Sequence, residues 1–301
     1  MSNVFILLLL QTSMHSQEWK VLLESPKKYN VSICAIFKNE AKYLKEWIEY
    51  HRLIGVDHFY LYNLSSTDQF MEVLSPYIKN HILTLVHWPD FIGCQDEEYA
   101  FKWALGTQIP AYEHAAHFLA VKETTWLVFL NVDEFLVCPQ TKNLKETLEK
   151  YDTHPGITLS CDFFDASTDT FPKRQLLIET LELTKPPKQS VHKKIAKTIF
   201  KPDLCKGFIW PPYECLFKSN ETAVSVKKWE LRINHYTNRN EGFFFAKAKE
   251  KLPIDNRMLD EELISELLAL DYAIEDQDRV IYQFIPEMLK KMGYDPRWVW
   301  E

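Results

Sequence analysis

The chain has 301 residues, of which 46% are hydrophobic and 26% are charged, and its formal net charge is -7. This composition supports one large or two small folded domains and excludes a disordered chain or a membrane-embedded bundle. The negative charge argues against general nucleic-acid binding, which needs a basic face.

Residues 1–29 are predicted to form an N-terminal extension. Val4 to Leu10 are apolar but too few to span a bilayer. No Lys or Arg precedes this run, and Ser13 and Ser16 are poor cleavage sites, so a signal peptide is weakly supported. The 6 dispersed cysteines contain no C-x-x-C pair and predict neither a zinc site nor a disulfide framework. We therefore expect a cytoplasmic or weakly membrane-associated protein rather than an exported one.

The region that follows predicts a β-α-β-α-β alternation. Asn30–Phe37, His58–Tyr62 and Ile82–His87 are short apolar or β-forming runs, and a helix is expected over Gln69–Leu74. Such an alternation implies a right-handed, mostly parallel sheet with helices on its faces.

The first helix is expected to begin after Asn39, a suitable N-cap residue, and to end at Gly55. Two faces are predicted from the helical spacing, an inner one with Leu44, Trp47, Ile48 and His51 and an outer one with Lys45, Glu46, Glu49 and Arg52. His51 is therefore expected to be a packed histidine rather than a ligand.

Further elements continue the α/β pattern. After an irregular region over residues 88–106, a helix is predicted at Ala111–Lys122, a buried strand over the apolar run Trp126–Leu130, a helix at Leu144–Tyr151 and a strand at Ile157–Phe164. The segment from Gln175 to Phe217 predicts strands and loops, Lys228–Ile233 a short strand, and Glu241 to about Met292 a helical tail. We expect one α/β domain over residues 30–250 with a helical extension, residues 251–301, packed on it.

Polar side chains follow three of the predicted strands. They are Lys38 to Glu40, Asn63 to Asp68, and Asn131 to Glu134. Because ligands of open α/β sheets bind at the carboxyl ends of the strands, this edge is predicted to hold a nucleotide. Any one of these groups alone would be interpreted as a solvated turn.

Four further side chains suit a bound diphosphate. The Asp133 and Glu134 carboxylates favour a hard divalent cation, and Mn²⁺ also accepts an imidazole such as His235. Lys197 offers a positive charge to phosphate. Neither G-x-G-x-x-G nor G-x-x-x-x-G-K-[ST] occurs, so a phosphate is expected to be held by metal and lysine rather than by a glycine loop.

Several blocks in the same order resemble glycosyltransferase family 92, a group of GT-A nucleotide-sugar transferases. The blocks cover roughly residues 31 to 250 and are Ile36–Glu40 with Leu44–His51 and Gly55–Val56, Tyr60–Asn63 with Ser66 and Asp68, Gln108–His114, Trp126–Leu136, Lys197–Pro202, and Ile233–Tyr236.

The resemblance implies a GT-A-like fold and a metal-dependent inverting transferase that uses a nucleotide sugar, often UDP-galactose, with Mn²⁺ or Mg²⁺ and a glycan acceptor. It places the nucleotide near Lys38, Asn39, Glu40, Asn63, Ser66, Asp68, Gln108 and Asn131. It implies that Asp133 binds the metal, that His235 completes the metal shell, and that Lys197 lies near the diphosphate. The family motif usually has Asp where this chain has Asn131, which keeps an oxygen but brings no charge.

Inversion in one displacement needs a general base beside the acceptor hydroxyl. Asp165 and Glu241 are the favoured candidates, with Asp162 and Glu214 also open. Two rival functions remain, a metal-dependent nucleotidyl or phosphoryl transferase and a non-catalytic nucleotide- or glycan-binding protein.

Overall fold

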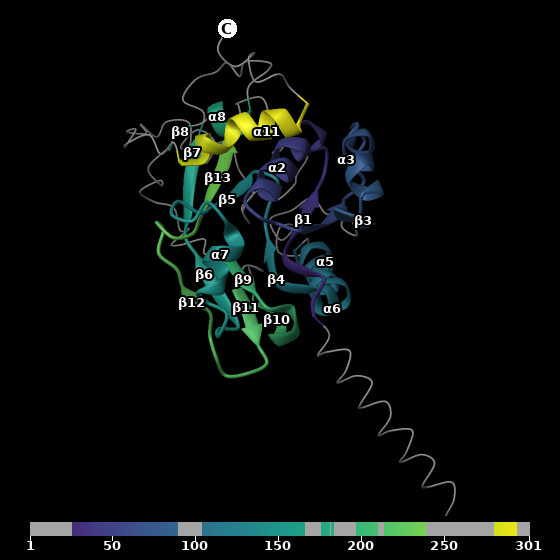
Figure 1. Ribbon diagram of the computed structural model, residues 1–301. Coiled ribbons are helices and arrows are strands. Elements are labelled where there is room, and N and C mark those ends of the chain that lie inside the picture. Colours follow the sequence, from purple (N-terminus) through teal and green to yellow (C-terminus); the bar gives the residue numbers. More distant parts are fainter. Residues whose placement is uncertain are drawn as a thin grey trace, which may run out of the picture.

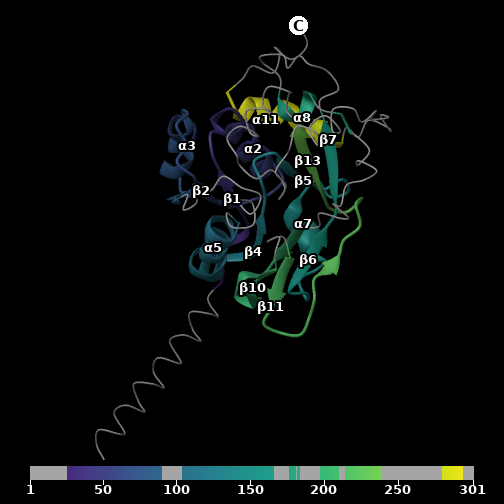
Figure 2. The ribbon, with the colours of Figure 1, turned by 180° about the vertical axis from the view of Figure 1, so that it is seen from behind.

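The computed structural model of the chain describes residues 26–89, 104–165, 176–180, 182–183, 197–209, 214–238 and 280–293 (Figures 1 and 2). Its main sheet has seven strands in the order β12-β6-β9-β4-β1-β2-β3. Their bounds are Val224–Ser225 for β12, Gly156–Leu159 for β6, Lys197–Phe200 for β9, Thr124–Phe129 for β4, Tyr29–Phe37 for β1, His58–Asn63 for β2 and Leu83–His87 for β3.

Strands β4, β1, β2 and β3 run parallel to one another, and β12 is parallel to β6. Strand β9 lies between β4 and β6 and is antiparallel to both. The sheet is therefore mostly parallel, as the sequence predicted, and this arrangement is the one expected of a GT-A-like α/β fold.

Successive residues of β1 pack against helices on opposite faces of the sheet. The side chains of Val31 and Ile33 belong to the core beneath α2 (Ala41–Leu53) and α3 (Phe70–Lys79), whereas Cys34 belongs to a second core with α5 (Ile109–His114). Because successive side chains of a strand point to opposite faces, these two cores lie on the two sides of the sheet. Helices flank the sheet on both faces, as predicted.

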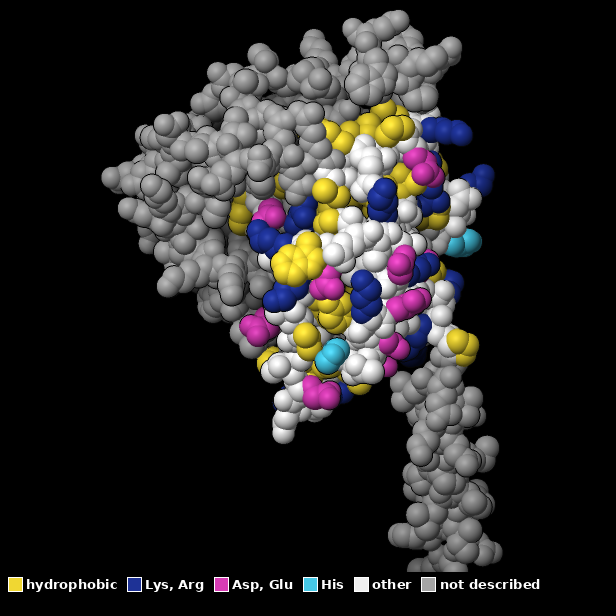
Figure 3. All heavy atoms as spheres, turned by 60° about the vertical axis from the view of Figure 1, so that its left-hand side comes forward, with side chains coloured by type: hydrophobic (Ala, Val, Ile, Leu, Met, Phe, Trp, Pro, Cys, Tyr) yellow, Lys and Arg dark blue, Asp and Glu magenta, His cyan; other side chains and the backbone are white. Residues whose placement is uncertain are grey.

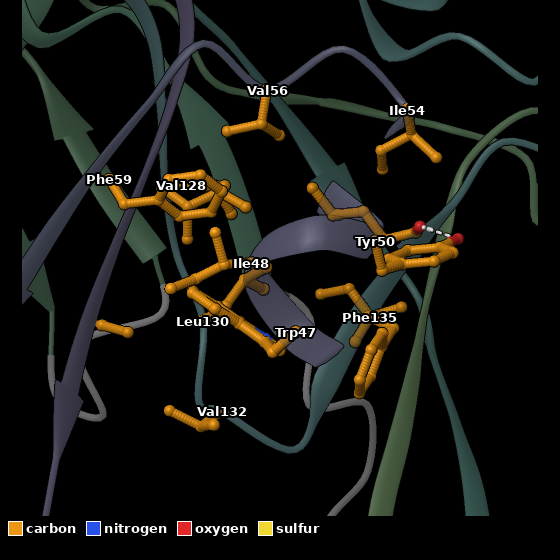
Figure 4. Packing of buried hydrophobic residues seen from close by; sticks show 14 of the residues in the cluster. Trp47, Ile48, Tyr50, Ile54, Val56, Phe59, Val128, Leu130, Val132 and Phe135 are labelled. Atoms are coloured by element: carbon orange, nitrogen blue, oxygen red, sulfur yellow. Dashed lines mark hydrogen bonds between the residues drawn. The ribbon is translucent and has the colours of Figure 1, made fainter. Parts of the chain in front are cut away.

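Helix α2 packs its inner face closely (Figure 4). Trp47 Nε1 donates a 2.8 Å hydrogen bond to the Glu134 carbonyl, and His51 Nδ1 lies 2.8 Å from the Trp47 carbonyl. His51 is fully buried, and burial lowers its pKa to about 3. The prediction that His51 is a packed histidine is confirmed, and Gly55 ends the helix with a φ of 105°.

Glu46 and Glu49 were predicted on the outer face of α2, and that prediction is wrong. Both are 4% exposed. The Glu46 carboxylate accepts backbone hydrogen bonds from the first two residues of α8 (Leu177–Thr180), at 2.9 and 3.1 Å. Glu49 accepts the Tyr77 hydroxyl at 2.8 Å. Distant partners in the chain make these burials favourable.

The strand predicted at Ile157–Phe164 is divided between two sheets, as β6 and then β7 (Cys161–Asp165). The strand predicted at Trp126–Leu130 is β4, and β5 (Glu134–Val137) begins after the polar residues that follow it. Strands β5 and β7 join β13 (Arg232–Asn238) and β8 (Glu182–Leu183) in a second sheet with the order β5-β13-β7-β8. The short strand predicted at Lys228–Ile233 instead begins at Arg232.

The remaining strands, β10 (Cys205–Ile209) and β11 (Glu214–Phe217), form an antiparallel hairpin at the opposite end of the molecule from α11 (Ile285–Lys291) (Figure 1). Other short elements are the π-helical η1 (Ala104–Gln108) and η2 (Ala115–Ala120), α6 (Val121–Glu123), α7 (Leu144–Glu149), η3 (Pro202–Leu204) and η4 (Val280–Phe284).

Helical structure from Ala104 to Glu123 extends the predicted 111–122 helix in both directions. Of the predicted helical tail, η4 and α11 are described, and α11 packs on α2, where Lys45 Nζ donates to the Met292 carbonyl at 2.6 Å. The rest of the tail and residues 1–25, with the predicted membrane-associating run, lie outside the described residues. Among the described residues, no helix has the length and apolar character needed to cross a membrane.

Candidate functional site

The carboxyl ends of β1 and β2 are joined by side-chain hydrogen bonds between the loops that follow them. Phe37 pairs with Asn63 at the ends of the two strands. The Asn39 backbone N–H donates to Ser66 Oγ at 2.9 Å, and the Thr67 N–H donates to Asn39 Oδ1 at 2.8 Å. Two of the three polar strand ends predicted to converge are therefore in direct contact.

Asp68, rather than Asn39, caps helix α2. Asp68 Oδ2 accepts the Ala41 backbone N–H at 2.7 Å. Asn39 has a φ of 56°, a left-handed conformation that Asn tolerates better than most residues, and its side chain turns to the neighbouring loop. The predicted N-cap role of Asn39 is thus wrong. Asp68 Oδ1 is buried and has no hydrogen-bond partner among the described residues, so it retains accepting capacity.

The structure also describes four other predicted nucleotide contacts, three of them at this edge. Asn63 is 3% exposed, and its Oδ1 accepts the Ser66 N–H at 2.9 Å. Lys38 and Glu40 flank Asn39 directly after β1, Lys38 half-buried and Glu40 buried. Gln108 ends η1 and is also buried.

The third polar strand end is a turn between the two sheets. Asn131 follows β4, and the Glu134 N–H closes the turn onto the Asn131 carbonyl at 3.1 Å. Strand β13 then lies beside β5, with His235 paired opposite Glu134. The Tyr236 N–H donates to the Asp133 carbonyl at 2.9 Å. This register brings Asp133 and His235 together from widely separated parts of the chain.

The side chains of Asp133 and His235 form the centre of the candidate site. His235 Nε2 lies 3.5 Å from Asp133 Oδ1, and His235 Nδ1 lies 3.9 Å from Glu134 Oε1. Burial lowers the pKa of His235, but the Asp133 carboxylate, with Cys161 and Glu134, raises it well above its usual value. A metal ion binding here would therefore displace a proton from the imidazole.

The pair fits part of a divalent-metal site. Two neighbouring ligands that are each about 2.1 Å from one ion lie roughly 3 Å apart, close to the separation of Asp133 Oδ1 and His235 Nε2. Carboxylate oxygen and imidazole nitrogen are both accepted by Mn²⁺. Within the described ranges, no cluster of three or more His, Cys, Asp or Glu side chains is arranged for a metal. The other ligands would then be water and phosphate oxygens, as is common for Mg²⁺-type sites.

Glu134 has a structural partner that the sequence did not reveal. Its Oε2 lies 2.5 Å from Lys197 Nζ and accepts the Asn131 N–H at 2.6 Å. The Glu134 and Lys197 side chains are 1% and 2% exposed. Glu134 and Lys197 therefore fix the turn that carries Asp133. The contact of Lys197 with a diphosphate stays a prediction, and its ammonium group is already paired in the structure.

The structure describes three of the four candidate general bases. Asp165 ends β7, in the same sheet as β13, and Glu241 lies outside the described residues. Asp162 forms ion pairs with Lys228 and, at 3.5 Å, with Arg232 Nε. The Asp162 carboxylate is therefore already engaged by two cations. Glu214 is exposed on the β10–β11 hairpin, outside the sheet that carries His235.

On the side of the molecule in Figure 3, basic and acidic side chains of the described residues are interspersed rather than gathered into one basic patch.

Comparison with known proteins gives consistent matches along the chain. A family model described as glycosyltransferase family 92 matches residues 27–266. A glycosyltransferase family 92 protein of Oryza sativa subsp. japonica is 28% identical over 218 residues, which are 70% of this chain and 33% of that protein. One of Ricinus communis is 32% identical over 114 residues, 38% of this chain and 17% of the relative. The chain thus spans about a third or less of these relatives.

Solved structures show a looser likeness. S. aureus TarS 1–349 in complex with UDP-GlcNAc has a TM-score of 0.39 and 14% identity, over 87% of this chain and 73% of that one. Glucosyl-3-phosphoglycerate synthase from Mycobacterium tuberculosis, in complex with Mn²⁺, UDP and glucosyl-3-phosphoglycerate, has a TM-score of 0.26 and 14% identity over 45% of this chain and 44% of that one.

Proposed function

The chain belongs to glycosyltransferase family 92, and on this basis we propose that it transfers a hexose, with galactose favoured, from a UDP-sugar to a glycan acceptor. The reaction would depend on Mn²⁺ or Mg²⁺ and invert the anomeric carbon. The observation that carries this proposal is the meeting of Asp133 and His235 at the edge where the parallel strands of the main sheet end.

The edge of the sheet offers the hydrogen-bonding groups that a nucleoside needs. The side chains of Asn39, Ser66 and Asn63 hold the loops after β1 and β2 in a fixed arrangement. Asp68 Oδ1 is the atom there that is buried and lacks a partner among the described residues, so it suits a ribose hydroxyl. A preformed loop pair would bind the nucleoside with little loss of conformational freedom.

Asp133 and His235 would hold the metal ion, which when bound would neutralise negative charge on the diphosphate leaving group. Glu134 and Lys197 orient the turn beneath Asp133 and keep its carboxylate directed at His235. The partly exposed Asn131 would then contact ribose or a metal-bound water rather than the metal itself.

A general base must take the proton from the acceptor hydroxyl as that oxygen attacks the anomeric carbon. Asp165 is the favoured residue for this role, because it ends the strand beside β13, which carries His235. Glu241 follows β13 in the sequence and is the alternative. Replacing each by its amide should separate them, since loss of the base lowers kcat while UDP binding is kept.

Calorimetry of UDP binding tests the metal site. The wild-type chain should bind UDP in the presence of Mn²⁺ and weakly without it, and Asp133→Asn should weaken binding by roughly 100-fold. Asp203→Asn, a change in η3 outside the site, is the matched control and should bind as wild type. Absence of UDP binding with and without Mn²⁺ would remove the transferase proposal. Retained turnover in Asp133→Asn would mean that the metal is held elsewhere.

A donor screen with UDP-galactose, UDP-glucose and UDP-N-acetylglucosamine tests the sugar. Faster hydrolysis or transfer with UDP-galactose is expected. Tight binding of every donor without turnover of any would instead favour a non-catalytic nucleotide-binding protein. Release of pyrophosphate from a nucleoside triphosphate would favour a nucleotidyl transferase.

A further inference from the structure

Cys205 of β10 and Cys215 of β11 lie in contact inside the β10–β11 hairpin. The Cys215 thiol donates a hydrogen bond to Cys205 Sγ, and the two sulfur atoms are 3.0 Å apart. Cys205 is fully buried and Cys215 is 6% exposed. Both are thiols in the structure. The dispersed spacing of the cysteines predicted no such contact.

The hairpin register explains the contact. Cys205 on β10 pairs with Phe217 on β11, and Cys215, two positions before Phe217 on β11, pairs with Phe208 on β10. Because alternate residues of a strand share a face, Cys205, Cys215 and Phe217 point to the same side of the hairpin. An irregularity between Cys205 and Gly207 shifts the register and draws the diagonal pair together.

The surroundings of the two sulfurs are apolar. Both cysteines belong to the second core, with Phe129 and Phe200 of the main sheet. Phe208, on the same hairpin, packs its ring 4.9 Å from Phe129 and 5.4 Å from Phe200. In the part of the chain that the structure describes, no third His, Cys, Asp or Glu completes a metal site with them. The chemistry open to two adjacent thiols without a third ligand is oxidation to a disulfide.

We propose that Cys205 and Cys215 form a disulfide bond that fixes the β10–β11 hairpin on the face of the main sheet. A disulfide needs a sulfur separation of about 2.05 Å, so the thiols must approach by roughly 1 Å. Cys34 and Cys138 are also buried thiols, and neither makes a sulfur–sulfur hydrogen bond among the described residues. These two are expected to stay reduced.

The oxidant is a small-molecule disulfide such as oxidised glutathione. A thiolate of one cysteine attacks a glutathione sulfur, the glutathione S–S bond breaks, and one glutathione leaves. The second cysteine then attacks the protein sulfur of this mixed disulfide and releases the second glutathione. The cysteine pair loses two electrons, glutathione disulfide gains them, and the two thiol protons pass to the two glutathiones.

Burial affects when this reaction occurs. The hydrogen bond to Cys205 and burial both raise the pKa of Cys215, so little thiolate forms in the closed hairpin. Oxidation is therefore expected to be slow in the folded protein and faster when the hairpin opens or first folds.

Mass spectrometry tests the bond directly. The full chain is incubated in a glutathione buffer rich in the oxidised form, either as folded protein or during refolding from guanidinium chloride. It is then quenched, unfolded and alkylated. A Cys205–Cys215 linked peptide should accumulate in both samples and faster in the second, with Cys34 and Cys138 alkylated. Equal alkylation of Cys205, Cys215 and Cys138 in both samples would overturn the proposal.

Thermal unfolding gives a second, independent measurement. Closing a loop of about eleven residues should raise the Tm of the oxidised protein by roughly 5 °C over the same protein in a phosphine reductant. The double variant Cys205→Ala/Cys215→Ala should show no response to reductant, while Cys138→Ala should respond as wild type. Identical melting of oxidised and reduced wild type would count against the disulfide.

Discussion

The buried ion pair between Lys197 and Glu134 makes a specific stability prediction. The two charged atoms are 2.5 Å apart and the side chains are 2% and 1% exposed. Lys197→Met keeps most of the side-chain volume but leaves the Glu134 carboxylate in the interior without its ammonium partner. Removing one member of a buried pair costs about 3–5 kcal/mol.

The remaining contacts of Glu134 place the expected loss near the lower end of that range. The Asn131 N–H still donates to Glu134 Oε2 at 2.6 Å, and His235 Nδ1 stays 3.9 Å from Oε1. A hydrogen bond to a charged group contributes about 1.5–3 kcal/mol, so the carboxylate is not left wholly unsatisfied. We expect a loss of about 3 kcal/mol and a fall in Tm of roughly 5 °C.

Urea unfolding followed by tryptophan fluorescence measures this loss. Lys291→Met is the matched control, because Lys291 pairs with Glu287 on the surface, at 3.9 Å, and should lose less than about 0.5 kcal/mol. The double variant Lys197→Met/Glu134→Gln should recover most of the stability, since its buried amide carries no charge. A loss below about 1 kcal/mol in Lys197→Met, or no recovery in the double variant, would refute the reasoning.

Three further predictions concern the fold around the site. The pKa of His51 is about 3 in the folded chain against 6.5 ordinarily, so stability should fall by up to ~1.4 kcal/mol per pH unit as pH drops from 6.5 toward 3, because only the unfolded chain takes up the proton. His51→Gln should remove that contribution to the pH dependence of the urea midpoint. In Gly156→Ala, the new Cβ would lie 2.6 Å from Phe217 Cζ, and the overpacking should cost about 1–3 kcal/mol in urea unfolding. A partial rescue by Phe217→Leu would confirm the clash, and full stability of the single variant would contradict it. Asp68→Ala should lose the cap on the Ala41 N–H and lower stability by about 0.5–2 kcal/mol by thermal melting, whereas Asp68→Asn keeps an oxygen acceptor and should lose less.

The local pattern of the sequence was sufficient for the first half of the main sheet. Strands β1, β2 and β3 come from short apolar runs, and helix α2 comes from apolar residues at helical spacing. Their alternation along the chain predicts that the strands are parallel neighbours. The packed state of His51 followed from the same helical spacing. The polar ends of β1 and β2 were expected to meet, and they do.

The breaks between sheets could not be predicted in this way. A run such as Ile157–Phe164 has the same pattern whether it stays in one sheet or crosses to another, and only pairing with β13 shows that a second strand begins at Cys161. Burial of Glu46 depends on backbone N–H groups about 130 residues away. The partner of Lys197, Glu134, lies 63 positions away in the sequence.

The pairing of β13 with β5 joins residues about a hundred positions apart, with His235 opposite Glu134. Contacts of such long range form slowly, because a large loop must close before any contact stabilises it. Strands β1, β2 and β3 pair with neighbours about 25 positions away in the sequence and can associate earlier. Refolding should therefore give native-like tryptophan fluorescence around Trp47 before the protein regains its UDP-binding capacity, and the delay would report the docking of β13.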